Sequence, residues 1–325
     1  MPSCRKAARV IPSDLRPLPE AQALSPAQYD LVLYFTVFAG FALLASSLYS
    51  MTSRSEISPR YRPAVIASMC ITTVAALSYL FLIVKWDSGY SLQGNVYQPN
   101  AEARLTQSPR YIDWSVTVPL LTAELITVCS LRGRTARRLR ASTMAAAFLM
   151  IFTGFLGAQV IDDGANVGAR VWWGLVSTLF LCYLYPALIY PVRRSMSTMS
   201  AAAGRTLEAA LVLLLGAFVV YPLVYAIPVF FDPTPRWTVT MHIAFSVADV
   251  AAKVGFGALV HRVAKLRTAE DLDADVDSHP ESVWISNVRY GEGMLPPVRP
   301  GGRPTVGSGE PSSRREASLP PASPS

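Results

Sequence analysis

Seven long apolar segments alternate with short polar stretches and leave few folds open to this chain of 325 residues. They fall near residues 27–51, 63–84, 111–131, 142–161, 169–191, 206–231 and 237–263. Each is long enough to cross about 30 Å of hydrocarbon as a helix that rises about 1.5 Å per residue. A backbone in lipid must satisfy its own hydrogen bonds, so helices are the expected form. The sequence therefore predicts an all-α membrane protein, a bundle of seven transmembrane helices.

The composition supports a membrane location. Hydrophobic residues make up 51% of the chain and charged residues 16%, whereas soluble domains carry about a quarter charged residues. A single water-soluble domain is therefore excluded. The cysteines form no CxxC or CxxH pair, so we expect no metal site and no disulfide framework. They are Cys4, Cys70, Cys129 and Cys182.

Loop arginines predict the orientation of the helices. The first, third and fifth loops are rich in arginine, whereas the opposite loops hold few basic residues. Under the positive-inside rule, this bias places the N-terminus outside the cell membrane and the C-terminus in the cytoplasm. Topology thus accounts for the net charge of +7, and no nucleic-acid partner is needed. The loop arginines are Arg54, Arg60, Arg62, Arg132, Arg134, Arg137, Arg138, Arg140, Arg193, Arg194 and Arg205.

Both ends of the chain differ in composition from the apolar region at 27–265. Residues 1–26 are polar and predict an extracellular N-terminal segment. Residues 266–325 combine an acidic stretch with an end rich in Pro, Ser and Gly. Such a sequence cannot bury a core, so we expect a disordered cytoplasmic tail. Docking of a partner on this tail is left open.

Four ionisable residues stand inside the apolar segments: Asp113, Glu124, Asp249 and Lys253. A charge at such a depth costs several kcal/mol and marks a candidate functional site. Asp249 lies one helical turn before Lys253 on the same face. One interpretation is a structural ion pair between the third and seventh helices. The other is a chromophore site, in which the amine condenses with an aldehyde to a Schiff base and two carboxylates balance its charge.

One face of the third segment carries Asp113, Thr117 and Glu124. Thr117 is four residues after Asp113, so its hydroxyl can reach that carboxylate. Glu124 is eleven residues after Asp113, which is three turns and about 16 Å deeper toward the cytoplasm. This spacing allows an imine to lie between two proton-exchanging groups. A hydrogen bond from Glu124 to a neighbouring helix is the structural alternative.

Two motifs resemble those of the microbial (type 1) rhodopsins. The run RYIDWSVTVPLLTAE, from Arg110 to Glu124, is similar to the third helix of that family, and DVAAKVGFG, from Asp249, is similar to its retinal-binding seventh helix. The resemblance covers residues 27 to about 265 and implies a seven-helix bundle with retinal in its centre. Shorter matches support it at Met150 to Gly154, Ser177-Thr178 and Tyr221-Pro222.

This resemblance implies a light-driven outward proton pump, which is an ion transporter and not an enzyme. All-trans retinal is implied on Lys253 as a protonated Schiff base, with Asp113 as proton acceptor and counterion. Asp249 is implied as the second counterion, and Glu124 as the cytoplasmic proton donor. Arg110, one turn outward of Asp113, is implied to hold that carboxylate ionised. A homo-oligomer in the lipid bilayer, either a trimer or a pentamer, is also implied.

The residues at 113, 117 and 124 separate the types of pump. Asp, Thr and Glu at these positions form the triplet of proteorhodopsin- and xanthorhodopsin-like proton pumps. A chloride pump would need a neutral residue at 113, and sodium pumps carry Asn and Gln in the triplet. Within the family, the alternative is a sensory photoreceptor that signals through a partner, although sensors usually lack a donor such as Glu124. Outside the family, it is a helical membrane protein without a chromophore.

The family resemblance also implies a pocket for retinal. A conjugated apolar rod packs against flat rings, so Trp114, Tyr221 and Tyr225 are expected along the polyene. Phe218 stands where the family usually has a tryptophan, which implies softer packing there. The other residues implied to bind retinal are Leu121, Met150, Gly154, Ser177 and Pro222.

Three features differ from close relatives or vary among them. Ser78 replaces the histidine that pairs with the acceptor aspartate in most proteorhodopsins and xanthorhodopsins. Gly174 matches the glycine that opens a window beside the retinal ring in xanthorhodopsin, so a hydroxylated carotenoid antenna is a candidate second cofactor. Close helix packing is the alternative explanation for this glycine, and an alignment shifted by one residue would place Trp173 there. His242 is a weak substitute for the paired glutamates of the proton-release group in bacteriorhodopsin.

Overall fold

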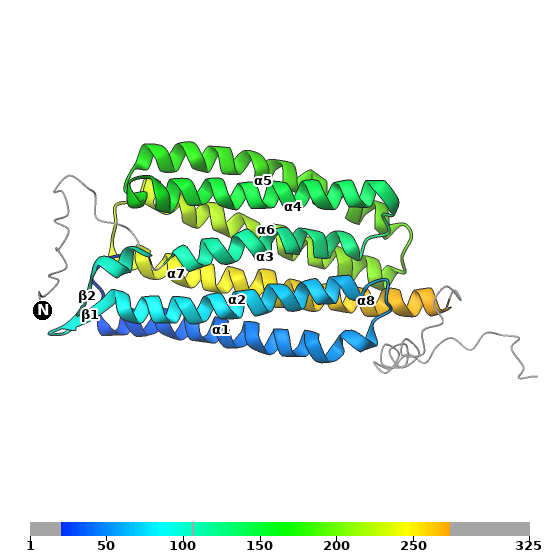
Figure 1. The fold of residues 1–325 in the computed structure, drawn as a ribbon, viewed down its shortest axis with the longest axis horizontal. Helices are drawn as coiled ribbons and strands as arrows, with labels where there is room; N and C mark the ends of the chain where they lie inside the picture. Colours follow the sequence, from blue (N-terminus) through cyan, green and yellow to red (C-terminus); the bar gives the residue numbers. More distant parts are fainter. Residues whose placement is uncertain (1–20, 106, 274–325) are drawn as a thin grey trace, which may run out of the picture.

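The computed structural model of the chain describes residues 21–105 and 107–273. Long helices dominate this part and run alongside one another (Figure 1). They are α1 (Pro26–Ser53), α2 (Arg62–Gly89), α3 (Ser108–Thr127), α4 (Gly133–Phe155), α5 (Val167–Met196), α6 (Ala201–Phe230), α7 (Pro235–Asp249) and α8 (Phe256–Asp273). The π-helical segment Val250–Gly255 joins α7 to α8 without a loop, so together they form one seventh helix. The predicted seven-helix bundle is confirmed.

Apolar surface and a charged interior characterise the bundle. Six of its helices are long and apolar enough to cross a membrane. The remaining one, α3, carries three ionisable residues, Arg110, Asp113 and Glu124, and all three are buried. Many of the large exposed side chains are apolar, among them Phe41, Leu179 and Phe230. An outer surface of this kind fits a chain surrounded by lipid.

Capping residues explain where several helices begin. The Ser25 hydroxyl accepts a hydrogen bond from the backbone N–H of Gln28 and forms a capping box with it before α1. The side chains of Asn166, Ser200 and Thr234 accept hydrogen bonds in the same way before α5, α6 and α7. Prolines occupy the first turn of α1, α2, α3 and α7. They are suited to it because an N–H there would have no partner within the helix.

Prolines also lie inside three helices. Each one removes a backbone hydrogen bond and its ring pushes against the preceding turn, so the helix bends or loosens there. The α3 helix holds one such proline, whereas α5 and α6 hold two each. They are Pro119, Pro186, Pro191, Pro222 and Pro228.

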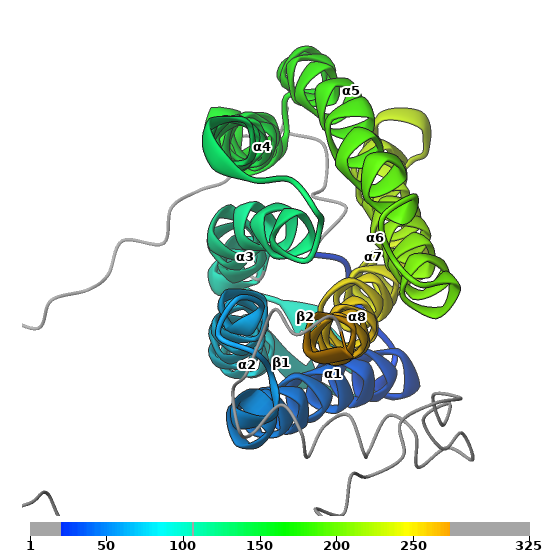
Figure 2. The ribbon, with the colours of Figure 1, turned by 90° about the vertical axis from the view of Figure 1, so that its right-hand side faces the viewer.

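The helices form a closed ring. Each one from α1 to α6 packs against the next, and α7 packs against both α6 and α1. Figure 2 shows this arrangement from one end of the bundle. The connections after α1, α3 and α5 lie at the end where α8 terminates (Figure 1). All three arginine-rich connections therefore lie at the same end.

At this end the helices extend beyond the apolar segments. The α4 helix begins at Gly133, although the apolar stretch begins near residue 142, so four arginines assigned to the third loop lie in its first turns. Arg193 and Arg194 likewise lie in the last turn of α5. Hydrophobicity marks only the part of a helix that lies in hydrocarbon. The backbone hydrogen bonds of the helix continue past that limit.

A β-hairpin closes the opposite end of the bundle. Strands β1 (Tyr90–Gln93) and β2 (Val96–Pro99) pair in antiparallel register, and the turn between them contains Gly94 at a φ of 65°. Leu24 and Tyr97 exchange two backbone hydrogen bonds of 2.9 and 2.8 Å. The ring of Tyr29 stacks on Tyr97 with centroids 3.8 Å apart. The all-α prediction missed this hairpin because its strands are only four residues long.

The seventh helix continues past the boundary predicted at residue 265. It ends at Asp273, so residues 266–273 are helical and were wrongly assigned to a disordered tail. The rest of the predicted tail lies outside the described residues. Most of the predicted N-terminal segment lies outside them as well.

Contacts with the α1–α2 connection hold this extension of α8. The Arg60 guanidinium pairs with the Asp271 carboxylate at 2.8 Å, and the Tyr61 hydroxyl donates to the same carboxylate at 2.8 Å. Burial raises the pKa of Tyr61 to about 12, so the hydroxyl keeps the proton that it donates. The Thr268 hydroxyl accepts a hydrogen bond from the backbone N–H of Ser58. The extension is thus part of the folded bundle.

Tyr61→Phe tests this attachment. The substitution removes one hydrogen bond to a carboxylate, so we expect the free energy of unfolding to fall by about 1 kcal/mol. Thermal unfolding of the purified protein in detergent measures the change. Tyr34→Phe is the matched control because the Tyr34 side chain is 65% exposed. Equal effects of the two substitutions would contradict the attachment.

Candidate functional site

Lys253 lies inside the bundle, in the π-helical turn of the seventh helix. Its side chain is 1% exposed. The amine forms an ion pair with Asp113 of α3 and a second one with Asp249 of α7, at 3.3 Å. The structure therefore brings together the amine and both carboxylates that the sequence singled out, around one buried point.

Asp249 is the better satisfied of the two carboxylates. Its Oδ1 accepts hydrogen bonds from the Tyr221 hydroxyl at 2.7 Å and from the Trp114 indole N–H at 2.9 Å. Its Oδ2 accepts one from the Tyr79 hydroxyl at 2.9 Å. These donors come from α6, α3 and α2. Hydrogen bonds to an ionised acceptor are stronger than those between neutral groups, so this set stabilises a carboxylate anion.

Asp113 has fewer partners. Its Oδ2 contacts the Lys253 amine, whereas Oδ1 is buried without a hydrogen-bond partner among the described residues. The Thr117 hydroxyl donates to the backbone carbonyl of Asp113 at 3.0 Å and lies beside the Asp113 carboxylate. The Ser78 hydroxyl donates to the backbone carbonyl of Pro109 at 2.9 Å. One oxygen of Asp113 is thus left for a further partner.

Arg110 pairs with a different aspartate from the one that the sequence indicated. Its guanidinium lies 3.5 Å from Asp249 and donates to the Tyr79 hydroxyl at 2.8 Å and to the Ser246 hydroxyl at 3.2 Å. Its direct ion pair is therefore with Asp249, and an effect of its charge on Asp113 stays a prediction. Position along α3 places Arg110 one turn outward of Asp113, but its long side chain reaches across to α7.

The sequence analysis missed Tyr79 and Ser246. The Tyr79 hydroxyl accepts a hydrogen bond from one guanidinium nitrogen of Arg110 and donates one to Asp249. The Ser246 hydroxyl accepts a hydrogen bond from a second guanidinium nitrogen. The one available signal was a tyrosine in the middle of an apolar segment, because a buried phenol hydroxyl usually needs a hydrogen-bond partner. That signal does not indicate which helix supplies the partner.

Glu124 lies on the same face of α3 as Asp113, as predicted. It is 1% exposed, and both carboxyl oxygens are buried without a hydrogen bond among the described residues. The Ser68 hydroxyl of α2 lies beside it. The two roles considered for Glu124, as a proton donor and as a hydrogen-bonding group toward a neighbouring helix, both stay predictions.

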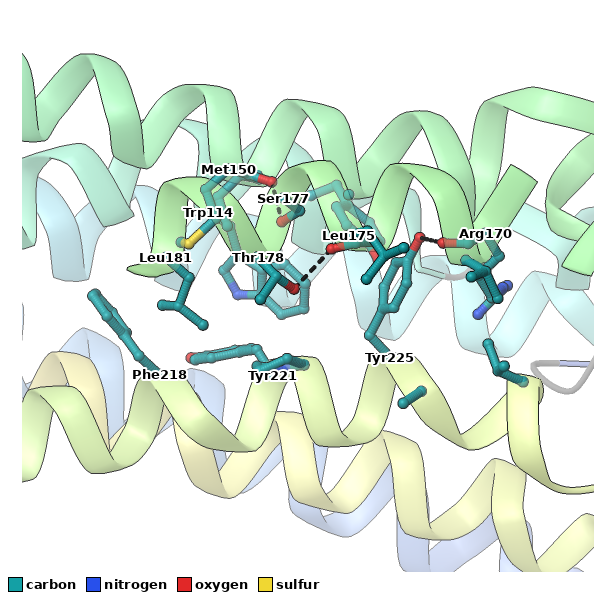
Figure 3. A pocket seen from close by; sticks show the side chains of 18 of the residues that line it. Trp114, Met150, Arg170, Leu175, Ser177, Thr178, Leu181, Phe218, Tyr221 and Tyr225 are labelled. Atoms are coloured by element: carbon teal, nitrogen blue, oxygen red, sulfur yellow. Dashed lines mark hydrogen bonds between the residues drawn. The ribbon is translucent and has the colours of Figure 1, made fainter. Parts of the chain in front are cut away.

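An apolar cavity of about 240 Å³ adjoins the charged site and is bounded by α3, α4, α5, α6 and α7. Trp114 and Tyr221, which both donate to Asp249, form part of its wall (Figure 3). The predicted pocket residues that line it are Trp114, Met150, Gly154, Gly174, Ser177, Phe218, Tyr221, Pro222 and Tyr225. Leu121 is buried in the same core but does not line this cavity.

The backbone accepts the hydrogen bonds of several polar side chains around the cavity. Ser177 donates to the Met150 carbonyl at 2.7 Å, and Tyr225 donates to the Arg170 carbonyl at 2.9 Å (Figure 3). These side chains therefore offer few free polar groups to a ligand. The wall suits a long apolar molecule, and its Trp114 side leads to the carboxylates that face Lys253.

Gly174 allows a close approach between α5 and α6. A Cβ at this position would lie 2.8 Å from Cε1 of Tyr225. A Cβ at Gly157 would lie 2.6 Å from the Tyr225 hydroxyl. The ring of Tyr225 therefore fills the space that the two glycines leave. The structure thus shows close packing at Gly174, and a carotenoid window there stays a prediction.

Gly174→Leu tests this packing. The leucine should displace the Tyr225 ring and lower the free energy of unfolding by about 1–3 kcal/mol, the usual cost of overfilling a packed site. Gly216→Leu is the matched control, because a Cβ there meets nothing within 4 Å. Thermal unfolding measures both variants. Adding Tyr225→Ala should remove part of the cost, and equal destabilisation by the two leucines would contradict the packing.

Known proteins similar to this chain share its fold over most of its length. A family model described as bacteriorhodopsin-like protein matches residues 31–266. Blue-light absorbing proteorhodopsin from Gamma-proteobacterium Hot 75m4 is 24% identical over 234 residues, which are 72% of this chain and 85% of that protein. Cruxrhodopsin-3 from Haloarcula vallismortis is 28% identical over 213 residues, which are 64% and 79% of the two chains.

A solved structure extends the comparison. The crystal structure of xanthorhodopsin, a light-driven ion pump with dual chromophore, matches with a TM-score of 0.71 and 32% identity, over 78% of this chain and 99% of that one. The fold, the apolar spans and the buried lysine are thus found together with a family match over most of the chain. The chain belongs to the bacteriorhodopsin-like family of microbial rhodopsins.

Proposed function

We propose that this protein is a light-driven outward proton pump that carries all-trans retinal on Lys253 as a protonated Schiff base. The observation that carries the proposal is the unequal pair of acids beside the buried amine. Asp249 accepts four hydrogen bonds, the longest from Arg110 at 3.5 Å, whereas Asp113 keeps one oxygen without a partner among the described residues. Such a site can hold a positive charge at rest and offers one acid to receive a proton.

The residues around the amine fit retinal. The cavity is apolar, and its wall includes the flat side chains of Trp114, Tyr221 and Tyr225. Retinal, when bound, supplies absorption of visible light and an isomerisation that changes the direction and proton affinity of the nitrogen. The Tyr225 ring lies against Gly174; retinal is the proposed chromophore, and a carotenoid beside Gly174 stays a prediction.

Asp113 is the proposed proton acceptor. Its Oδ2 already contacts the Lys253 amine, so a proton has a direct path to this carboxylate. Asp249, the proposed second counterion, is held as an anion by its three donors and by Arg110. Loss of the positive charge at Lys253 removes a partner from both acids. Asp113 then has fewer remaining hydrogen-bond donors than Asp249 to stabilise its negative charge, and so it is the acid that takes the proton.

Glu124 is the proposed donor that restores the proton. It lies about 16 Å along α3 from Asp113, on the side of the amine where α3 ends. Neither of its oxygens has a close hydrogen-bond partner among the described residues, and the Ser68 hydroxyl is the polar group beside it. The proton therefore moves from Glu124 to the nitrogen on one side and from Asp113 to the exterior on the other.

Membrane orientation sets the direction of transport. The three arginine-rich connections lie at one end of the bundle, the end toward which Glu124 is displaced from Asp113 (Figure 1). The positive-inside rule supports a cytoplasmic location for that end. We therefore propose a cell-membrane protein with its N-terminus outside and its C-terminus inside. A trimer or a pentamer stays a prediction.

A sensory photoreceptor is the second candidate function. The chain beyond Asp273, where a partner would dock, lies outside the described residues. The buried carboxyl of Glu124 favours a pump, because a protein that only signals has no need of a proton donor on the inner side. The two functions differ in whether light moves protons across the membrane.

Replacing Lys253 tests the function. Cells that express the protein should acidify their medium on illumination, and a protonophore should abolish the signal. In Lys253→Ala we expect a purified protein without visible colour and a complete loss of the pH change. Lys85→Ala removes a partly exposed lysine and is the matched control. A coloured wild-type protein that moves no protons would support the sensor instead.

Glu124→Gln tests the donor. We expect the return of the proton to the nitrogen to slow by about 100-fold, because a positioned proton donor is lost. The spectrum in the dark should stay unchanged, since this residue lies three turns from Asp113. Flash photolysis measures the recovery, and added azide should restore it. Recovery at the wild-type rate would remove Glu124 from the mechanism.

A further inference from the structure

One buried histidine has no part in the proposed pump. His261 lies in α8 and is 6% exposed. Both of its ring nitrogens lack a hydrogen-bond partner among the described residues, as both oxygens of Glu124 do. Buried polar groups without partners are uncommon in folded proteins, and each calls for an explanation. Here two ionisable side chains without partners occur in the same half of the bundle.

Helical spacing connects His261 to Lys253. Gly257, His261 and Lys265 follow Lys253 by four, eight and twelve residues, so each lies one turn beyond the one before it and about 40° further around the seventh helix, on one gradually turning face. The rise of a helix places His261 about 12 Å beyond Lys253, and Lys265 about 6 Å further. This turning face thus leads from the buried amine toward Asp273 in α8.

Gly257 gives α2 access to this face. A Cβ at this position would lie 2.6 Å from the Ser68 hydroxyl, so the glycine allows that hydroxyl to sit directly against α8. The same hydroxyl lies beside the Glu124 carboxyl. Ser68 therefore lies between Glu124 and the face of α8 that carries His261 one turn further along.

The outer end of this face reaches solvent. Lys265 pairs at 2.6 Å with Glu56 of the short helix Arg54–Glu56, and the Glu56 side chain is exposed. One turn further inside, the His261 ring packs edge-on against Tyr49 of α1, with centroids 5.3 Å apart. Polar side chains are also buried along this half of α1, at Ser47, Ser50 and Ser53.

We propose that His261 is the station through which protons from the cytoplasm reach Glu124. The inference rests on the proposed pump function and extends it to the step that reloads the donor. His261 lies between the exposed Glu56–Lys265 pair and the Ser68 hydroxyl. A neutral imidazole can accept a proton on one nitrogen and donate one from the other, and here neither nitrogen is engaged.

Protons balance in this step. Water on the cytoplasmic side gives a proton to one nitrogen of neutral His261 and leaves as hydroxide, or a hydronium ion gives it and leaves as water. The imidazolium then gives its other N–H proton, across the Ser68 hydroxyl, to the Glu124 carboxylate. That carboxylate is an anion because its own proton has gone to the nitrogen at Lys253. His261 ends neutral and Glu124 ends protonated.

The neighbouring charges suit a transient carrier. Lys265 of the same helix and Glu56 are the charged groups that act on the His261 ring among the described residues, and Tyr49 faces it from α1. The positive charge of Lys265 opposes a proton on the ring, whereas the negative charge of Glu56 favours one. The negative charge on Glu124 after it has donated would also attract a proton to this half of the bundle.

His261→Phe tests the proposal in the full-length protein with retinal bound. Phenylalanine keeps the ring contact with Tyr49 but cannot carry a proton. We expect proton uptake from the cytoplasmic side to slow at least tenfold, while the transfer from Glu124 to the nitrogen and the dark spectrum stay at wild-type values. In this variant, the rate of proton uptake should also fall by about tenfold for each unit by which the pH rises, because uptake then depends on direct collision with protons in solution. Flash photolysis with a pH-sensitive dye measures both steps.

His261→Gln provides a second variant without a titratable ring, in case phenylalanine prevents folding. Tyr49→Phe is the packing control and should leave uptake unchanged. Wild-type uptake and pH dependence in both histidine variants would overturn the role of His261 while leaving the pump intact. A wild-type protein that takes up no proton after a flash would instead overturn the proposed function itself.

Discussion

The burial of one amine beside two carboxylates, within a bundle surrounded by lipid, is the constraint on which the rest of the structure depends. Three charges at this depth are tolerated only when each is paired and hydrogen-bonded. Lys253 pairs with both acids, and Asp249 also takes Arg110. Because the remaining donors come from α2, α3 and α6, these electrostatic contacts fix the positions of four helices relative to one another.

An imbalance between the acids turns this structural arrangement into a candidate proton path. Asp249 is surrounded by donors, whereas Asp113 has an oxygen without a partner among the described residues. Further along the bundle, the side-chain polar atoms of Glu124 and His261 are buried without a close hydrogen-bond partner in the described part of the chain. The groups that are least satisfied at rest are thus spaced from the centre toward one end, which is how a sequence of short transfers could be arranged.

The helices and the central charges could be predicted from the sequence, whereas most partners could not. Each apolar segment must form a helix in lipid, because its backbone hydrogen bonds have to be satisfied within the segment. The spacing of Asp113, Asp249 and Lys253 then leaves few ways to pair these three side chains. The reach of Arg110 to Asp249 depends on the direction of a long side chain between helices, which spacing along α3 does not determine. The Tyr225 ring beside Gly174 depends on packing between α5 and α6. Hydropathy likewise could not show the ordered end of α8, because that end is polar.

The prolines inside the helices divide the bundle mechanically. Four of the five lie in α5 and α6, which border the cavity, and α1, α2 and α7 have none beyond their first turn. The central charges connect α2, α3, α6 and the seventh helix, and the hairpin contacts α1. Strain from a chromophore that changes shape in the cavity would therefore be relieved most readily at the interrupted backbone hydrogen bonds of α5 and α6.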